Sequence, residues 1–222
     1  MTDRVAGRSS APGESEPAGP GAATSPDVAA ALWSETLQVL AATVAHDLRN
    51  ALNAVAVNLE VVRGRSARGA DAAAIAPFAA VAAASFETAA AASEALLAFA
   101  RAEPGDGDVA AIVARLARLL AVRDSRTVDV SDRSGGRART RVPTDIVRTV
   151  VARSVLAAFG SGDNGDVVAC EITVDDGIFL RVTVATGSPP LLEPELVAAV
   201  AQYGVRFTSR AQSLELHFPA LG

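Results

Sequence analysis

The chain of 222 residues is poor in several residue types. It has no lysine, so arginine supplies all 20 positive charges against 25 Asp and Glu residues, and the formal net charge is −5. Because a basic excess is needed to neutralise a phosphate backbone, nucleic-acid binding is not expected. The single cysteine, Cys170, excludes an internal disulfide and a multi-cysteine zinc site. One unpaired cysteine fits a reducing cytosol.

The chain also lacks a long, strongly apolar run. Its longest stretch without a charged residue, Ala72–Phe86, has 15 residues and is mostly alanine, whereas a membrane span needs about 20 apolar residues. The N-terminal residues show no apolar stretch of the kind found in signal peptides. We therefore expect no transmembrane helix and a cytoplasmic protein. Half of the residues are nevertheless hydrophobic, which is enough for one large domain or two small ones.

The first 26 residues are predicted to form a disordered tail, because Ala, Gly, Pro, Ser and Glu recur there without a hydrophobic period. Ser25 followed by Pro26 is then a helix-start signal, a cap residue before a proline at the first helical position. The apolar residues that follow recur at steps of three and four, which is typical of one long helix. They are Leu37, Leu40, Val44, Leu48, Leu52, Val55, Leu59 and Val62.

A glycine-containing run, residues 63–69, ends this stripe, and a second helix follows with Ile75, Phe78, Val81 and Phe86 among its apolar positions. Residues 27–103 are thus predicted to form a helical hairpin. Two helices of about 30 to 38 residues joined by a short turn cannot bury both faces alone. The many alanines allow helices to approach closely, so we expect a homodimer that forms a four-helix bundle.

Residues 103–108 are rich in Gly, Pro and Asp and mark the predicted domain boundary. Beyond it, residues 104–222 show helical and alternating patterns in turn. This mixture predicts a small α+β sandwich with helices on one face of a mixed sheet. The expected helices are Val109–Val122, Thr144–Phe159 and Glu193–Tyr203, and the expected strands are Thr127–Val130, Val167–Val174, Ile178–Ala185, Val205–Thr208 and Ser213–Phe218.

Only two histidines are present, and His46 lies in the middle of the first predicted helix. The i to i+4 spacing places His46 and Asn50 on one helix face. A neutral imidazole is a good nucleophile toward phosphorus, so an exposed helical histidine can carry a phosphoryl group transiently. Taken without its neighbours, a solvated structural histidine is the commoner case.

The neighbours of His46 resemble the H-box of the two-component sensor histidine kinases. The matching residues are His46, Asp47, Leu48, Arg49 and Asn50, followed by Ala51, Leu52, Asn53, Ala54 and Val55. The chain departs from the pattern at Ala51, where these kinases usually have a kinking proline, so a straighter helix is expected here. Over roughly residues 27–219, the resemblance implies a dimeric hairpin followed by an ATPase-like α+β domain.

This ATPase-like domain lacks three features that the resemblance leads one to expect. Helix 145–159 contains no asparagine to hold magnesium, and residues 185–189 replace the adenine-binding Asp-x-Gly-x-Gly motif. Between Pro190 and Leu196 there is no room for a glycine-rich lid over the phosphates. The domain is therefore expected to be degenerate, to bind no ATP and to hold no cofactor. Asp163, Asn164 and Asp166 make a metal site conceivable, but a solvated turn is favoured.

A phosphoaccepting histidine without a working kinase domain resembles the phosphorelay histidine phosphotransferases. The resemblance implies that His46 takes a phosphoryl group from a response-regulator receiver domain, whose own Mg²⁺ holds the aspartyl phosphate. Asp47 would orient the imidazole, Asn50 would position a water for dephosphorylation, and Arg49 would steer the incoming phosphate. A surface charge, a solubilising amide and a solvated arginine are the respective alternatives.

Two other functions remain open at this point. One is a noncatalytic pseudokinase adaptor that binds receiver domains or a kinase, and the other is a residual histidine kinase or phosphatase. Docking specificity would reside in helix residues such as Asn53, Val57 and Glu60.

Three further residues have structural interpretations. Cys170 lies in an apolar strand and is expected to be a buried core thiol. Trp33 is expected to anchor the first helix against the end of the second. His217 alternates within the last strand and is expected to be half-buried.

Overall fold

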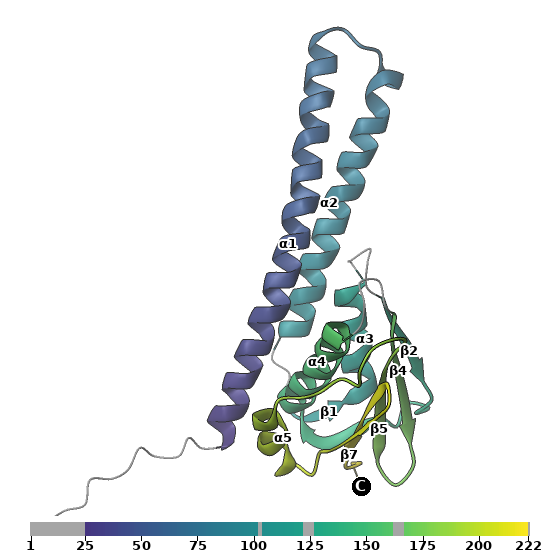
Figure 1. The fold of residues 1–222 in the computed structure, drawn as a ribbon. Coiled ribbons are helices and arrows are strands. Elements are labelled where there is room, and N and C mark those ends of the chain that lie inside the picture. The colour runs from purple at the N-terminus through teal and green to yellow at the C-terminus, as the bar shows by residue number, and fades with distance from the viewer. Residues whose placement is uncertain (1–24, 102–103, 122–126, 162–166, 222) are drawn as a thin grey trace, which may run out of the picture.

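The computed structural model describes residues 25–101, 104–121, 127–161 and 167–221. Residues 1–24 of the predicted tail lie outside this part of the chain. Two antiparallel helices form a long hairpin, and an α+β unit lies beside its base (Figure 1). The predicted fold class is therefore confirmed for a single chain.

The hairpin consists of α1 (Ser25–Ala67) and α2 (Ala72–Ala100). The helix α1 continues through Gly64, and the chain reverses at Gly69, whose φ of 74° suits glycine. Asp71 then caps α2 by accepting a hydrogen bond from the backbone N–H of Ala74 at 2.8 Å. The two helices pack through a seam that is largely alanine on the α2 side. Its buried residues are Leu40, Val44, Ala82, Ala89, Ala92 and Phe99.

By length and composition, α2 is the single helix of the described residues that can cross a membrane, with a mean hydropathy of 1.4 in its most apolar window. Only 11% of that window is buried within the chain. One such helix is weak evidence for a membrane span, because helices that pack on other helices pass the same test. The uncharged run recognised in the sequence forms the first half of this helix.

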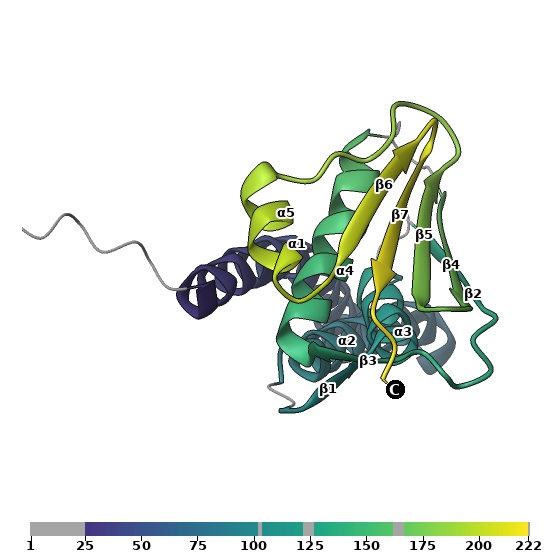
Figure 2. The ribbon, with the colours of Figure 1, turned by 90° about the horizontal axis from the view of Figure 1, so that it is seen from below.

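The α+β unit contains a five-stranded mixed sheet of order β2-β4-β5-β7-β6 and a small antiparallel pair, β1 with β3. The strand β2 pairs with β4 in parallel, and the other neighbours are antiparallel. The helices lie on one face of the sheet, as predicted (Figure 2). The strands are β1 (Asp106–Asp108), β2 (Thr127–Asp132), β3 (Arg139–Pro143), β4 (Val167–Val174), β5 (Ile178–Val184), β6 (Arg206–Arg210) and β7 (Ser213–Phe218).

Three helices complete the unit: α3 (Val109–Leu120), α4 (Thr144–Ser161) and α5 (Pro194–Ala201). Asp108 caps α3 by accepting from the N–H of Ala111 at 2.9 Å. On the hairpin, α3 packs against α2, whereas α4 and α5 pack against α1. One hydrophobic core therefore runs from the base of the hairpin to the sheet, and it includes Leu40, Phe99, Leu116 and Leu180.

Candidate functional site

His46 lies at the middle of α1 and is exposed to solvent. Its Nε2 is 3.2 Å from the amide Nδ2 of Asn50, one helical turn further along. An amide N–H can donate to Nε2 only when the neutral ring carries its proton on Nδ1. The contact therefore favours the tautomer in which Nε2 holds a free lone pair. In that tautomer, Nε2 is the atom that can attack an electrophile.

The i to i+4 spacing thus brings His46 and Asn50 together as the sequence predicts. Both side chains are exposed, so the contact can open without leaving a buried polar group unsatisfied. An incoming reactant can take the place of the amide at Nε2. The arrangement is that of an accessible nucleophile.

The other two predicted site residues flank this pair. Asp47 is half-buried and, at about 100° per residue, lies on the side of α1 that faces α2. Arg49 is exposed and lies on the opposite side of the helix. The orienting role of Asp47 and the steering role of Arg49 stay predictions.

Apolar side chains are exposed on the same face as His46. Val39 lies seven residues before it and Val57 eleven residues after it, so both share its face at helical spacing. Their exposed fractions are 44% and 63%. At 1.5 Å per residue, the two valines lie about 10 and 16 Å along the helix from His46, so they are separate apolar positions on its face.

Comparisons with known proteins return no matching family model and no matching curated protein. Solved structures do match over most of the chain. A histidine kinase of Acinetobacter baumannii, AdeS, shares 11% identity over 80% of this chain and 98% of its own, with a TM-score of 0.41. A structure titled as a bacterial phosphotransferase shares 15% identity over 82% and 94% of the two chains, with a TM-score of 0.40.

A third match is a histidine kinase from Burkholderia phymatum, with 14% identity over 83% of this chain and 96% of its own and a TM-score of 0.37. Because identities and TM-scores are this low, the function of this chain must be argued from its own residues.

The helix α4 stands where the resemblance expects the helix of a nucleotide site. Most of its residues are buried, among them Val147, Val150, Val151 and Val155. After β5 ends at Val184, only residues 185–193 precede α5. The absence of a phosphate-covering lid stays a prediction. The absence of ATP binding stays a prediction.

Within the described residues, no group of three or more His, Cys, Asp or Glu side chains is placed to hold a metal ion. The predicted turn with Asp163, Asn164 and Asp166 lies outside the described part of the chain. That no cofactor is bound therefore also stays a prediction.

The three structural interpretations are confirmed. The rings of Trp33 and Phe99 pack with centroids 5.9 Å apart. Cys170 is buried, and burial raises the pKa of its thiol to about 12. His217 is half-buried, and its Nδ1 accepts a hydrogen bond from Arg206 at 3.3 Å.

Sequence reasoning missed two arginines of α4, Arg148 and Arg153, which contact the base of the hairpin. The available signal was their presence in a helix that is otherwise largely apolar. Their partners come from distant parts of the chain, so the pattern alone does not reveal them.

Proposed function

We propose that this protein is a histidine phosphotransferase of a two-component phosphorelay, which passes a phosphoryl group between receiver-domain aspartates through His46. The observation that carries the proposal is the exposed His46 on a helical hairpin, with Asn50 at 3.2 Å from Nε2. The H-box sequence around it supports the same chemistry.

In the proposed reaction, the lone pair of His46 Nε2 attacks the phosphorus of an aspartyl phosphate on a receiver domain. The nitrogen–phosphorus bond forms while the bond from phosphorus to the aspartate oxygen breaks, and the carboxylate leaves with the electron pair. Attack by the aspartate of a second receiver reverses these steps. The Mg²⁺ belongs to the receiver, so this chain supplies only the nucleophile and its position.

The neighbours of His46 have supporting roles in this proposal. Asp47 orients the imidazole, and Arg49 attracts the incoming phosphate. Asn50 moves away from Nε2 on docking and can hold a water that hydrolyses the phosphate of the partner. Val39 and Val57 supply apolar contact on either side of the reacting nitrogen.

A second copy of the chain is part of the proposal. Leu52 and Leu59 are each 52% exposed on α1, and Phe86 and Leu97 are 60% and 69% exposed on α2. At about 100° per residue, both sets lie roughly a quarter turn from the α1–α2 seam and on the same side of the hairpin. Large apolar side chains that repeat along two helices are typical of a four-helix-bundle interface.

The proposed dimer explains why α2 is so apolar, with no need for α2 to span a membrane. Its alanines and its exposed Phe86 and Leu97 would be covered by the partner hairpin, which is why a helix with little burial in one chain can persist in water. We accordingly place the protein in the cytoplasm, where receiver domains act.

The proposal is tested by phosphoryl transfer to the full chain. The chain is incubated with receiver domains from its own cell that carry a radiolabelled aspartyl phosphate, and separately with radiolabelled ATP. We expect acid-labile label from a receiver, none from ATP, and none in His46→Ala. His217→Gln is the matched control, because it removes the other histidine and should leave transfer unchanged.

Transfer that persists in His46→Ala would show that the assignment is wrong. Label taken directly from ATP would show that the α+β unit is a kinase. Binding of a phosphorylated receiver without transfer would instead support the noncatalytic adaptor.

A further inference from the structure

Two arginines of α4 lie at the junction between the α+β unit and the hairpin. Arg148 is only 1% exposed, and the side chain of Arg153 is 12% exposed. A guanidinium cannot lose its proton in a protein, so its burial is costly unless hydrogen bonds and opposite charges surround it. Both arginines donate hydrogen bonds to groups of the hairpin. The opposite charge beside Arg148 is Asp145 of α4 itself, and its buried Nε has no hydrogen-bond partner among the described residues.

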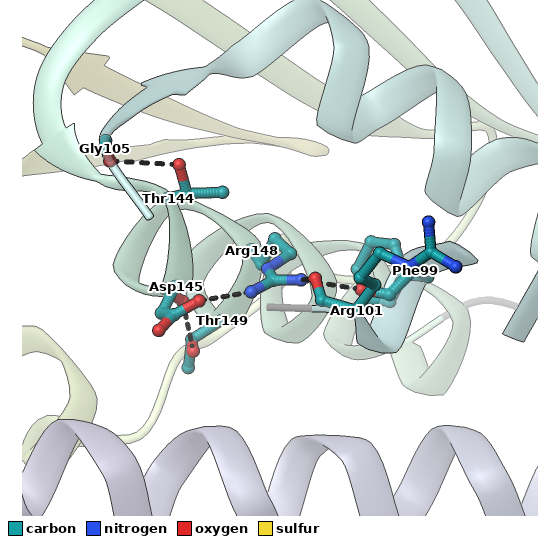
Figure 3. Close-up of polar contacts among 7 residues, drawn as sticks. All are labelled: Phe99, Arg101, Gly105, Thr144, Asp145, Arg148 and Thr149. Atoms are coloured by element: carbon teal, nitrogen blue, oxygen red, sulfur yellow. Dashed lines mark hydrogen bonds and ion pairs between the residues drawn. The ribbon is translucent and has the colours of Figure 1, made fainter. Parts of the chain in front are cut away.

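Arg148 reaches the C-terminal end of α2. Its Nη1 donates to the backbone oxygens of Phe99, at 2.9 Å, and of Arg101, and its Nη2 forms an ion pair with Asp145 (Figure 3). The last carbonyls of a helix lack intrahelical partners and carry the negative end of the helix dipole. Arg148 therefore caps α2 from another part of the fold.

The same guanidinium also contacts α1. Its central carbon lies 4.8 Å from the centroid of the Trp33 ring, and that ring packs on Phe99. A cation over an indole is attracted electrostatically by the ring quadrupole, whose faces carry partial negative charge. Arg148 thus joins α1, α2 and α4 at one point.

Arg153 makes a second junction further along α4. Its Nε donates to Oγ1 of Thr36 at 2.8 Å, and its Nη2 lies 2.7 Å from Glu35 Oε2, so both contacts are with α1. Its Nη1 lies 3.1 Å from Glu193, the residue before α5. The two arginines hold α4 to successive turns at the base of α1.

We infer that Arg148 and Arg153 form a clamp that fixes the α+β unit to the base of the hairpin and keeps it away from His46. Trp33 and His46 are 13 residues apart, which is about 20 Å along a helix that rises 1.5 Å per residue. The shared core extends up α1 to Val44, which at about 100° per residue lies on the other side of the helix from His46. The exposed face of His46 is therefore open to a partner. The need for an accessible His46 rests on the proposed function. The clamp itself does not depend on phosphotransfer.

Fluorescence of Trp33 can report on the clamp, because Trp33 is the only tryptophan of the chain and contacts Arg148. The experiment compares the intrinsic fluorescence of the full chain with that of Arg148→Gln. We expect the variant to keep its far-ultraviolet circular dichroism, to emit at longer wavelength, and to show quenching by acrylamide increased by about twofold or more, as for a locally opened region.

The matched control is Arg118→Gln, which removes an exposed arginine of α3 whose Nε donates only at 3.4 Å to Ala114 within its own helix. It should leave Trp33 fluorescence and quenching unchanged. If Arg148→Gln does not fold, Glu35→Gln with Glu193→Gln removes both acidic partners of Arg153 without touching a buried residue. We expect a smaller rise in quenching from this pair.

A folded Arg148→Gln with the emission and quenching of the wild type would overturn the clamp, and so would an unchanged Glu35→Gln/Glu193→Gln variant if that pair is the one tested. Small-angle X-ray scattering adds a second readout, in which the opened variant should have the larger radius of gyration. Neither measurement involves phosphate. A failed clamp and a failed phosphotransferase are therefore distinguishable.

Discussion

At the scale of single residues, His217 gives a prediction of pH dependence. Burial, followed by the charge of Arg206, lowers the pKa of His217 below its usual value of 6.5, although Asp176 and Glu215 oppose the shift. As the pH falls below about 6.5, His217 therefore binds a proton more readily in the unfolded chain than in the folded chain. Because protonation is harder in the folded state, the contribution of His217 to stability is fully present above its unfolded pKa, near neutral pH, and is lost on acidification.

Urea denaturation at pH 7.5 and at pH 5.5 measures the effect. We expect His217→Gln to lose less stability between these two pH values than the wild type does. His46→Gln, on the exposed surface of α1, is the control and should lose as much as the wild type. Equal losses in all three proteins would contradict the role of His217.

The residues that the sequence predicts well are those whose environment is local. The contact of His46 with Asn50 follows from helical spacing, and the burial of Cys170 follows from strand alternation. The buried Arg148 could not be predicted in this way, because an arginine in a helix is ordinarily solvated. Its burial depends on Phe99 and Arg101 at the end of α2, which are 49 and 47 residues away in the chain.

At the scale of elements, we expect substitution of two different glycines by alanine to change the free energy of unfolding in opposite directions. A Cβ on Gly107 in β1 would lie 2.5 Å from Val147 Cγ2 and 3.1 Å from the oxygen of Val142, so Gly107→Ala should destabilise the fold by about 1–3 kcal/mol. Gly160 in α4 has no heavy atom within 4 Å of such a Cβ. There, Gly160→Ala should stabilise by up to about 1 kcal/mol, because alanine favours the helix.

The free energy of unfolding in urea, measured for both variants and the wild type, checks this pair. A Gly107→Ala variant as stable as the wild type would show that β1 can move away from α4. The two substitutions add the same methyl group, so the difference between them reports the surroundings of the methyl group and the local backbone, a strand at Gly107 and a helix at Gly160.

The long elements were predictable because their apolar periods extend over many residues, as in α1, α4, β4 and β5. The pair β1 and β3 was missed, because β1 is only Asp106–Asp108 and contains no apolar side chain. Its pairing with β3 places Gly107 against Val147, and this contact exists only once the chain has folded.

At the scale of the whole molecule, the order of a hairpin followed by an α+β unit follows from the change of pattern near residue 105. How the two parts meet does not follow, because the shared core and the arginine clamp join residues far apart in sequence. The sequence treats the units as separate domains, whereas the structure places Phe99 and Leu40 in one core with the sheet.

The last prediction concerns the unpartnered side of the hairpin. If Leu52 and Leu59, each 52% exposed, pack against a second copy, replacing both with aspartate removes apolar burial worth about 1–1.5 kcal/mol for each leucine and puts charges into the interface. The dissociation constant of the dimer should then rise by far more than about tenfold, since each 1.4 kcal/mol corresponds to one factor of ten.

Light scattering after size exclusion distinguishes the species, with a mass of 22.5 kDa for one chain and twice that for the dimer. Val57→Asp is the matched control. Val57 is 63% exposed against 52% for Leu59, but it lies two residues away and so on the face of His46. It should leave the dimer intact while weakening transfer from a receiver.

A monomeric wild type, or a dimer that survives both leucine substitutions, would show that this apolar side has another role. A dimer lost through Leu52 and Leu59 but kept in Val57→Asp would assign one side of the hairpin to self-association and the other to the partner.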